Sequence, residues 1–123
     1  MSKPRKKKDN SKTLASLVIK GMQKKKAADV VCLDLRKLEN TVCDYFVICH
    51  GNSNTQVEAI ANSVEFEIKK KTGERPMHRE GFANAQWILI DYFDVIVHVF
   101  QKEFRDFYKL EDLWADAETV KIK

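Results

Sequence analysis

The chain has 123 residues, of which 44% are hydrophobic and 33% charged, and this composition predicts a single folded domain rather than a disordered chain. Its net charge of +4 is unevenly distributed, because residues 1–26 hold ten Lys or Arg and a single acid. No apolar run is long enough to cross a bilayer and none follows the basic end as in a secretory signal, so we expect a cytoplasmic protein without membrane contact.

The first ten residues are basic and lack apolar periodicity, so we expect residues 1–10 to be a tail that is disordered when free. Lysines neutralise the phosphates of anionic polymers without a specific pocket, which makes Lys6, Lys7 and Lys8 candidate nonspecific phosphate contacts. A purely solubilising tail explains the same pattern equally well. Apolar residues then recur at helical spacing and predict a helix over residues 12–26, namely Leu14, Leu17, Val18 and Met22.

Two short apolar runs rich in β-branched residues come next, and we expect residues 29–35 and 45–50 to be strands buried on both faces. The three cysteines lie in or beside these strands. Their odd number predicts reduced, partly buried thiols rather than a disulfide framework: Cys32, Cys43 and Cys49.

A second helix is expected over residues 53–72. Ser53 and Gln56 have the spacing of a capping box at its start, and Gly73 is placed to end it. Apolar residues form one face between these caps, so both ends and the buried face of this helix are predicted.

The second half of the chain predicts an edge strand within residues 76–81, then strands over residues 86–91 and 94–101. A short helical segment over residues 103–108 and an amphipathic end around residues 110–114 complete the order. Helices mixed with strands in this sequence predict an α/β fold in which a mixed sheet is covered by helices.

A tight hairpin is expected at Tyr92-Phe93, because it separates two strands by two residues. That turn would place Trp87 opposite His98, and Asp91 opposite Asp94, on one face of the sheet. The other face of the hairpin is aliphatic and is expected to be core. The face with Trp87 is either a partner surface, since tryptophan is common at binding hot spots, or is covered by a third helix.

Enzymatic interpretations find partial support. Gly51 and Ser53 at a helix start resemble the glycine-serine turn of nucleotidyltransferases, which makes nucleotide transfer or nucleotide binding the alternative function. The carboxylates that would hold its metal ions are not evident, because Glu65 and Glu67 lie mid-helix and point to different sides. No Cys or His spacing typical of a metal site occurs, and no nucleophile elbow is present.

Several motifs in fixed order resemble the ribosomal silencing factor (RsfS, Iojap) family. They cover residues 11–116 and are DYFVI at 44–48, GNS at 51–53, AIA at 59–61, DYFD at 91–94, VHVF at 97–100 and FYKLEDLW at 107–114, with Gln56, Glu80, Gly81 and Trp87. One departure is Phe93, which stands where the family commonly has glycine and leaves the turn type open.

The resemblance implies a domain over residues 11–116 followed by a short C-terminal tail, residues 117–123. The implied fold is a mixed five-stranded sheet flanked by helices, with nucleotidyltransferase-like topology but without the catalytic carboxylates. It further implies a factor without cofactor or turnover. Such a factor binds the large ribosomal subunit through ribosomal protein uL-fourteen, blocks joining with the small subunit and represses translation when nutrients are limiting.

On this basis the partner-binding face is expected to include Trp87, Asp91, Asp94, His98, Arg105 and Tyr108, and the anion contacted by the basic tail is expected to be ribosomal RNA. Acidic groups suit a partner drawn from the basic ribosomal proteins. The same exposed sheet face is also suited to a homodimer of the free protein before it meets the ribosome.

Overall fold

The computed structural model describes residues 7–39 and 41–122, with side chains from Ser11 onward. The first half of the chain forms α1 (Lys7–Lys24), β1 (Ala28–Asp34), β2 (Tyr45–Gly51) and α2 (Asn54–Thr72). The second half forms β3 (His78–Glu80), β4 (Trp87–Asp91), β5 (Val95–Gln101), α3 (Lys102–Tyr108), α4 (Leu110–Leu113) and β6 (Glu118–Lys121). The strands make one sheet in the order β3-β4-β5-β2-β1-β6.

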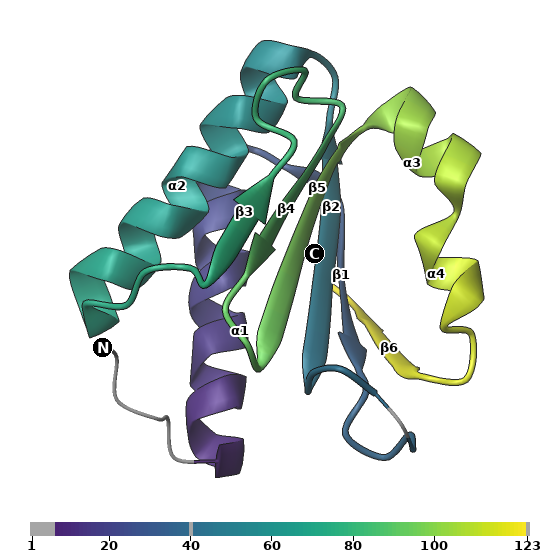
Figure 1. The fold of residues 1–123 in the computed structure, drawn as a ribbon. Coiled ribbons are helices and arrows are strands. Elements are labelled where there is room, and N and C mark those ends of the chain that lie inside the picture. The colour runs from purple at the N-terminus through teal and green to yellow at the C-terminus, as the bar shows by residue number, and fades with distance from the viewer. Residues whose placement is uncertain (1–6, 40, 123) are drawn as a thin grey trace.

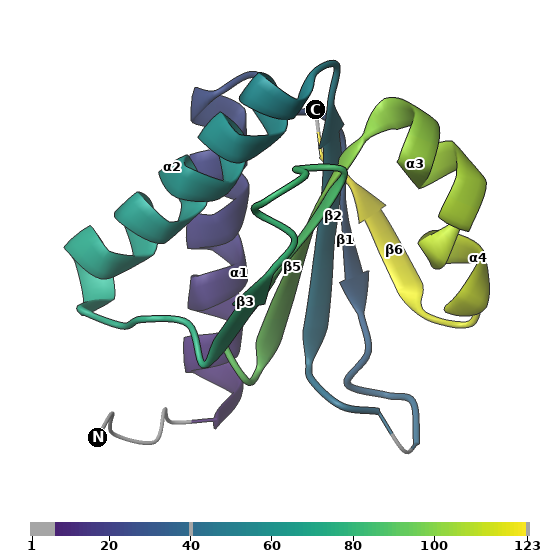
Figure 2. The same ribbon diagram turned by 45° about the horizontal axis from the view of Figure 1, so that its top comes forward.

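The sheet is the middle of three layers. Helices α1 and α2 cover one face, and the shorter α3 and α4 lie against the other (Figures 1 and 2). At its centre β2 and β5 pair in parallel, whereas every other neighbouring pair of strands is antiparallel. The predicted mixed α/β class is therefore confirmed, and its five-stranded count is wrong by one.

The additional strand is β6, which lies in the segment expected to be a short tail. Residues 118–121 pair with β1 at the edge of the sheet, and all four are exposed. Because backbone hydrogen bonds rather than buried apolar side chains hold β6 in place, its sequence lacks the apolar alternation that would have revealed it.

Helix α1 also extends further than expected, since it begins at Lys7 rather than near residue 12. Residues 7–10, which were assigned to the disordered tail, are therefore helical, whereas residues 1–6 of that tail lie outside the described residues. Lysine is a strong helix former, so a helix anchored by the apolar stripe that follows can extend back through residues without apolar side chains.

The predicted capping of α2 is confirmed. Ser53 Oγ accepts a hydrogen bond from the Gln56 backbone N–H at 3.1 Å, and Gly73 ends the helix at a φ of 77°. Gln56 also contacts the residues just after α1, because its amide nitrogen donates to the backbone oxygens of Lys25 and Lys26 at 3.3 Å. One side chain therefore ties the start of α2 to the loop that follows α1.

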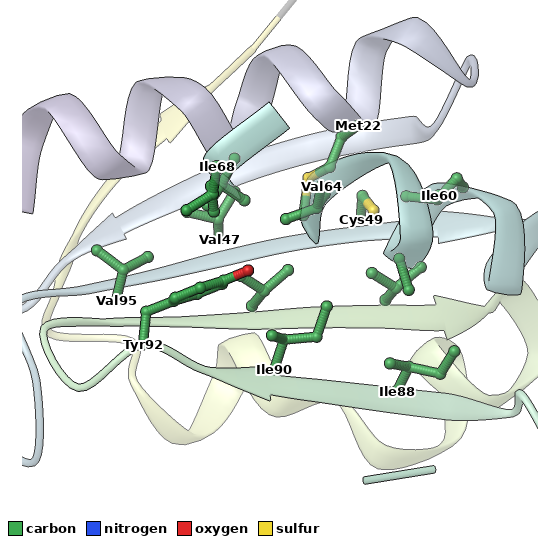
Figure 3. Packing of buried hydrophobic residues seen from close by; sticks show 14 of the residues in the cluster. Met22, Val47, Cys49, Ile60, Val64, Ile68, Ile88, Ile90, Tyr92 and Val95 are labelled. Carbon is green, nitrogen blue, oxygen red and sulfur yellow. The ribbon is translucent and has the colours of Figure 1, made fainter. Parts of the chain in front are cut away.

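The larger core lies between these two helices and the sheet (Figure 3). Apolar side chains spaced along both helices meet the aliphatic face of the central strands, as the sequence periodicity predicts. Among the fully buried members are Val18, Met22, Ile60, Val64, Ile68, Val47, Val97 and Val99. A smaller core lies on the other face, where Phe46, Ile48 and Phe100 pack under Leu110.

The hairpin between β4 and β5 has a different register from the one expected. Tyr92 donates its N–H to the backbone oxygen of Val95, so the turn residues are Phe93 and Asp94 rather than Tyr92 and Phe93. Trp87 consequently lies opposite Phe100 rather than His98. The physical cause is Tyr92, which is only 1% exposed and packs into the larger core (Figure 3), where a turn residue could not lie.

The shift of two residues preserves the faces, because side chains alternate with period two along a strand. Phe93 takes a φ of 76°, a region that few non-glycine residues adopt, and its N–H is bonded to a carboxylate oxygen of Asp91 at 2.7 Å. The turn therefore accommodates Phe where glycine would be unstrained.

Gly21 marks a close approach between α1 and α2. A Cβ atom there would lie 2.7 Å from Val64 Cα, a backbone atom that cannot move aside alone.

Gly→Ala in an exposed helix normally stabilises by about 1 kcal/mol. We predict the opposite for Gly21→Ala, a loss of about 1–3 kcal/mol by overpacking, measured by urea unfolding. Ser16→Ala on the exposed side of the same helix is the control, and a stabilised Gly21→Ala variant would contradict the close packing.

Candidate functional site

The candidate site is the face of the sheet that carries Trp87, on the side of α3 and α4. The Trp87 ring stacks on Phe100 of β5, with ring centroids 4.8 Å apart, and Tyr108 of α3 leans over it at 5.0 Å. Trp87 is partly buried and Tyr108 is 47% exposed. Of the two alternatives, the covering helix is present on one side of the tryptophan, and a partner surface on the side that stays open remains a prediction.

His98 lies beneath this aromatic surface rather than on it. The residue is 3% exposed, and its Nδ1 accepts a hydrogen bond from Trp87 Nε1 at 3.1 Å. Its ring and that of Phe46 lie edge to face with their centroids 4.8 Å apart. Because Nδ1 accepts, the proton of the neutral ring resides on Nε2, which is buried without a partner among the described residues. The expectation that the His98 side chain is exposed on this face is wrong, because the ring is buried and bonded to the tryptophan.

Burial lowers the pKa of His98 to about 3, so the ring is neutral at physiological pH. A charged imidazolium could not accept from Trp87, and none of the residues described here offers Nε2 a compensating carboxylate. The Trp87–His98 hydrogen bond thus depends on a neutral ring kept dry by its neighbours.

Arg105 was also expected on the partner face, but its side chain is only 8% exposed. Its guanidinium holds both carboxylate oxygens of Glu111, at 3.1 and 2.8 Å, and reaches the backbone oxygen of Asp29 at 2.8 Å. The same Nη1 lies 3.0 Å from His50 Nδ1. Arg105 therefore joins α3 to α4, β1 and β2, and its side chain is not exposed on this face as expected.

The two acidic residues occupy different places. Asp91 ends β4 on the tryptophan face and is partly buried, whereas Asp94 belongs to the turn. The Asp94 backbone oxygen accepts hydrogen bonds from the N–H groups of Asp44 and Tyr45, which anchors the hairpin tip to the start of β2. The structure thus brings Trp87, Asp91 and Tyr108 to one face and leaves Asp94 at its end.

Two members of the surface were missed from the sequence. Phe107 of α3 is 76% exposed and Leu113 of α4 is 75% exposed, so both project from the layer that carries Tyr108. The run of residues 107–114 has apolar side chains in several directions, and periodicity alone does not show which of them are free.

The two carboxylates considered as metal ligands for nucleotide transfer form ion pairs with basic side chains instead. Glu65 forms an ion pair with Arg79 and Glu67 forms one with Lys24. Within residues 7–39 and 41–122 the structure has no group of three or more His, Cys, Asp or Glu side chains that could hold a metal ion. The three cysteines are free thiols, and burial raises the pKa of each, to about 11 for Cys32.

The fold and the site together define a small mixed α/β domain with an aromatic surface beside α3. Residues 8–123 match the family model described as ribosomal silencing factor during starvation, RsfS. The chain belongs to the ribosomal silencing factor family.

Relatives from bacteria and from a plant are similar in sequence over most of the chain. The ribosomal silencing factor RsfS of Halalkalibacterium halodurans is 40% identical over 114 residues, which cover 93% of this chain and 96% of that protein. The one from Bacillus subtilis is 42% identical over 108 residues, covering 88% and 90%. The chloroplastic protein Iojap of Zea mays is 31% identical over 97 residues, 79% of this chain and 41% of that longer protein.

Solved structures show the same fold. A crystal structure of protein CV0518 from Chromobacterium violaceum superposes with a TM-score of 0.79 at 34% identity and covers 85% of both chains. A crystal structure from Bacillus halodurans gives a TM-score of 0.77 at 40% identity, covering 90% of this chain and 99% of that one.

Across the described part of the chain, no helix combines the length and apolar character that a membrane span requires.

The buried His98 predicts an acid-sensitive fold. Its pKa in the folded state lies below the ordinary 6.5, so its contribution to stability is complete above pH 6.5 and is lost as the pH falls towards 3. We expect a loss approaching about 1.4 kcal/mol per pH unit from this group, measured as urea unfolding between pH 6.5 and 4.5. His98→Gln, which keeps an acceptor but does not titrate, should flatten the dependence. Equal slopes in both proteins would show that His98 is not held neutral.

Proposed function

We propose that the protein binds the large ribosomal subunit through ribosomal protein uL-fourteen and thereby sterically prevents the small subunit from joining, which represses translation. Membership of the ribosomal silencing factor family supports the general role. The observation that carries the finer proposal is the partly open aromatic surface on β4 and α3, since an exposed aromatic cluster on a rigid sheet suits a protein partner. A steric block needs neither cofactor nor turnover, and the proposed place of action is the cytoplasm.

The proposed contact has Trp87 at its centre, Tyr108 beside it, and Asp91 with Asp94 towards the hairpin tip. Tryptophan and tyrosine supply large apolar areas with little loss of conformational freedom, and they are enriched at binding hot spots. The carboxylates complement a basic partner such as a typical ribosomal protein. His98 and Arg105 contribute from beneath, because one orients Trp87 and the other fixes the helix that carries Tyr108.

This function predicts that stoichiometric protein prevents formation of full ribosomes when the two subunits are mixed, as measured by light scattering. Trp87→Ala should lower the affinity for the large subunit, measured by pelleting, by about thirtyfold or more. This corresponds to a loss of about 2 kcal/mol of binding free energy, because a hot-spot side chain is removed. Phe66→Ala is the matched control, since Phe66 is also an exposed aromatic, at 63%, but lies on α2 across the sheet.

Thermal unfolding of both variants separates binding from folding. Trp87 is only partly buried, so truncation should cost less than the 3–5 kcal/mol expected for a fully buried aromatic. A folded Trp87→Ala protein that binds with unchanged affinity would remove Trp87 from the interface. Unchanged subunit joining in the presence of the wild-type protein would refute the proposed function itself.

We further propose that the basic end binds ribosomal RNA. Lys7 and Lys8 lie in the first turn of α1, and Lys6 lies outside the described residues. In a triple variant, Lys6, Lys7 and Lys8 are all changed to Gln. The logarithm of its binding constant for the large subunit should then depend less steeply on the logarithm of the salt concentration. The expected decrease is about 0.9 for each duplex-RNA phosphate that these lysines neutralise in the wild-type complex.

The matched control replaces Lys69, Lys70 and Lys71, at the last turn of α2, because it removes the same charge from another site. A slope that changes equally in both triple variants would indicate a general charge effect. A slope that changes in neither would leave the basic end as a solubilising tail.

A further inference from the structure

The centre of the sheet contains a change in the direction of its connections. Strands β2 and β5 are parallel neighbours that end side by side, with Gly51 opposite Gln101. The chain leaves β2 towards α2 on one face and leaves β5 towards α3 on the other (Figures 1 and 2). In open α/β sheets, small ligands bind in the crevice outside the carboxyl ends of strands at such a point.

A cavity lies beside this point, between α3 and the adjoining strands. It has a volume of about 710 Å³, within the range of small-molecule sites. Residues of β1, β2, α3, α4 and β6 line it, and its apolar part is Val30, Val31 and Ile122. A smaller hollow of about 340 Å³ adjoins it through the shared residues Lys102 and Asp106, and it reaches Asn52 and Gln101 at the strand ends.

His50 supplies a hydrogen-bond donor in the wall of the cavity. The residue is 5% exposed, and its Nδ1 lies 3.0 Å from Arg105 Nη1. Because a guanidinium can only donate, Nδ1 accepts and the ring proton lies on Nε2. Burial and the charge of Arg105 lower the pKa of His50, which keeps the ring neutral. Among residues 7–39 and 41–122 no group bonds to this Nε2–H.

The charges around the cavity are only partly paired. Lys102 pairs with Asp106 and Arg105 pairs with Glu111. Four further charged side chains line the cavity without an ion pair to any described residue, and they are Lys109, Lys121, Asp29 and Asp112. The cavity therefore offers two cations and one N–H to an anion, and two carboxylates to hydroxyl donors.

We infer that this crevice binds a small phosphate ester that carries hydroxyl groups, the chemistry shared by sugar phosphates and nucleoside monophosphates. The phosphate oxygens would accept hydrogen bonds from the ammonium groups and from the imidazole N–H. The sugar hydroxyls would donate to the carboxylates. The local backbone supports a built site, since Asp29 adopts a φ of 46° and the pairing of β1 with β2 is irregular between Ala28 and Val31. Arg105 holds this irregular segment through the Asp29 backbone oxygen.

Calorimetric titration of the full chain in magnesium-free buffer tests the inference. The probes are ribose 5-phosphate, adenosine 5′-monophosphate, inorganic phosphate and adenosine. Binding of either ester at least about tenfold tighter than phosphate and adenosine is expected, because only an ester meets both sets of groups. Tighter binding of the nucleotide than of ribose 5-phosphate would identify nucleoside monophosphates as the ligand class. Equal binding of the two would show that the sugar phosphate is recognised and the base is not.

Lys121→Gln should weaken ester binding about tenfold, whereas Lys37→Gln, which removes a lysine that is 78% exposed and outside the cavity, should leave it unchanged. His50→Gln, checked for folding by its thermal transition, should also weaken binding. The inference is overturned if no ester binds, if inorganic phosphate binds as tightly as the esters, or if the two lysine variants behave alike. None of these results depends on ribosome binding, so the proposed function is tested separately.

Discussion

The parallel pairing of β2 with β5 is the constraint on which the rest of the structure depends. Strands paired in parallel at the centre of a sheet are buried on both faces, and every residue of β2 is indeed buried. Each face therefore needs a cover. The two long helices provide it on one side, and the short α3 and α4, with the aromatic residues beneath them, provide it on the other.

The second cover is small, and polar contacts of one side chain add to the apolar core beneath it. Arg105 links α3 to α4 through Glu111, to β1 through the Asp29 backbone oxygen and to β2 through His50. The aromatic surface depends on this arrangement, because Tyr108 lies at the end of the same helix. A buried arginine therefore gives a seven-residue helix, too short to be stable alone, a fixed position beside Trp87.

Local features of the sequence were sufficient for much of the fold. The caps at Ser53 and Gly73 placed α2, and the aliphatic alternation placed β4 and β5 within about a residue. The remaining differences arise from contacts that are distant in sequence. The hairpin register depends on Tyr92 entering a core built by other elements, and the burial of His98 depends on Trp87 and on the cover provided by α3 and α4, neither of which alternation reveals.

The central strand pair also has a kinetic consequence. Tyr45 pairs with Val95, and the register continues unbroken to Gly51 and Gln101, so each contact joins residues 50 positions apart. The entropy of closing such a loop opposes formation of the pair, and contacts of this range slow folding. The helix α2 and strand β4 lie within the loop, and β4 pairs with β5 at its far end. Both α2 and the β4–β5 hairpin can form locally first and shorten the effective distance. The rate-limiting step of folding is then expected to be the docking of β2 against a hairpin that already exists.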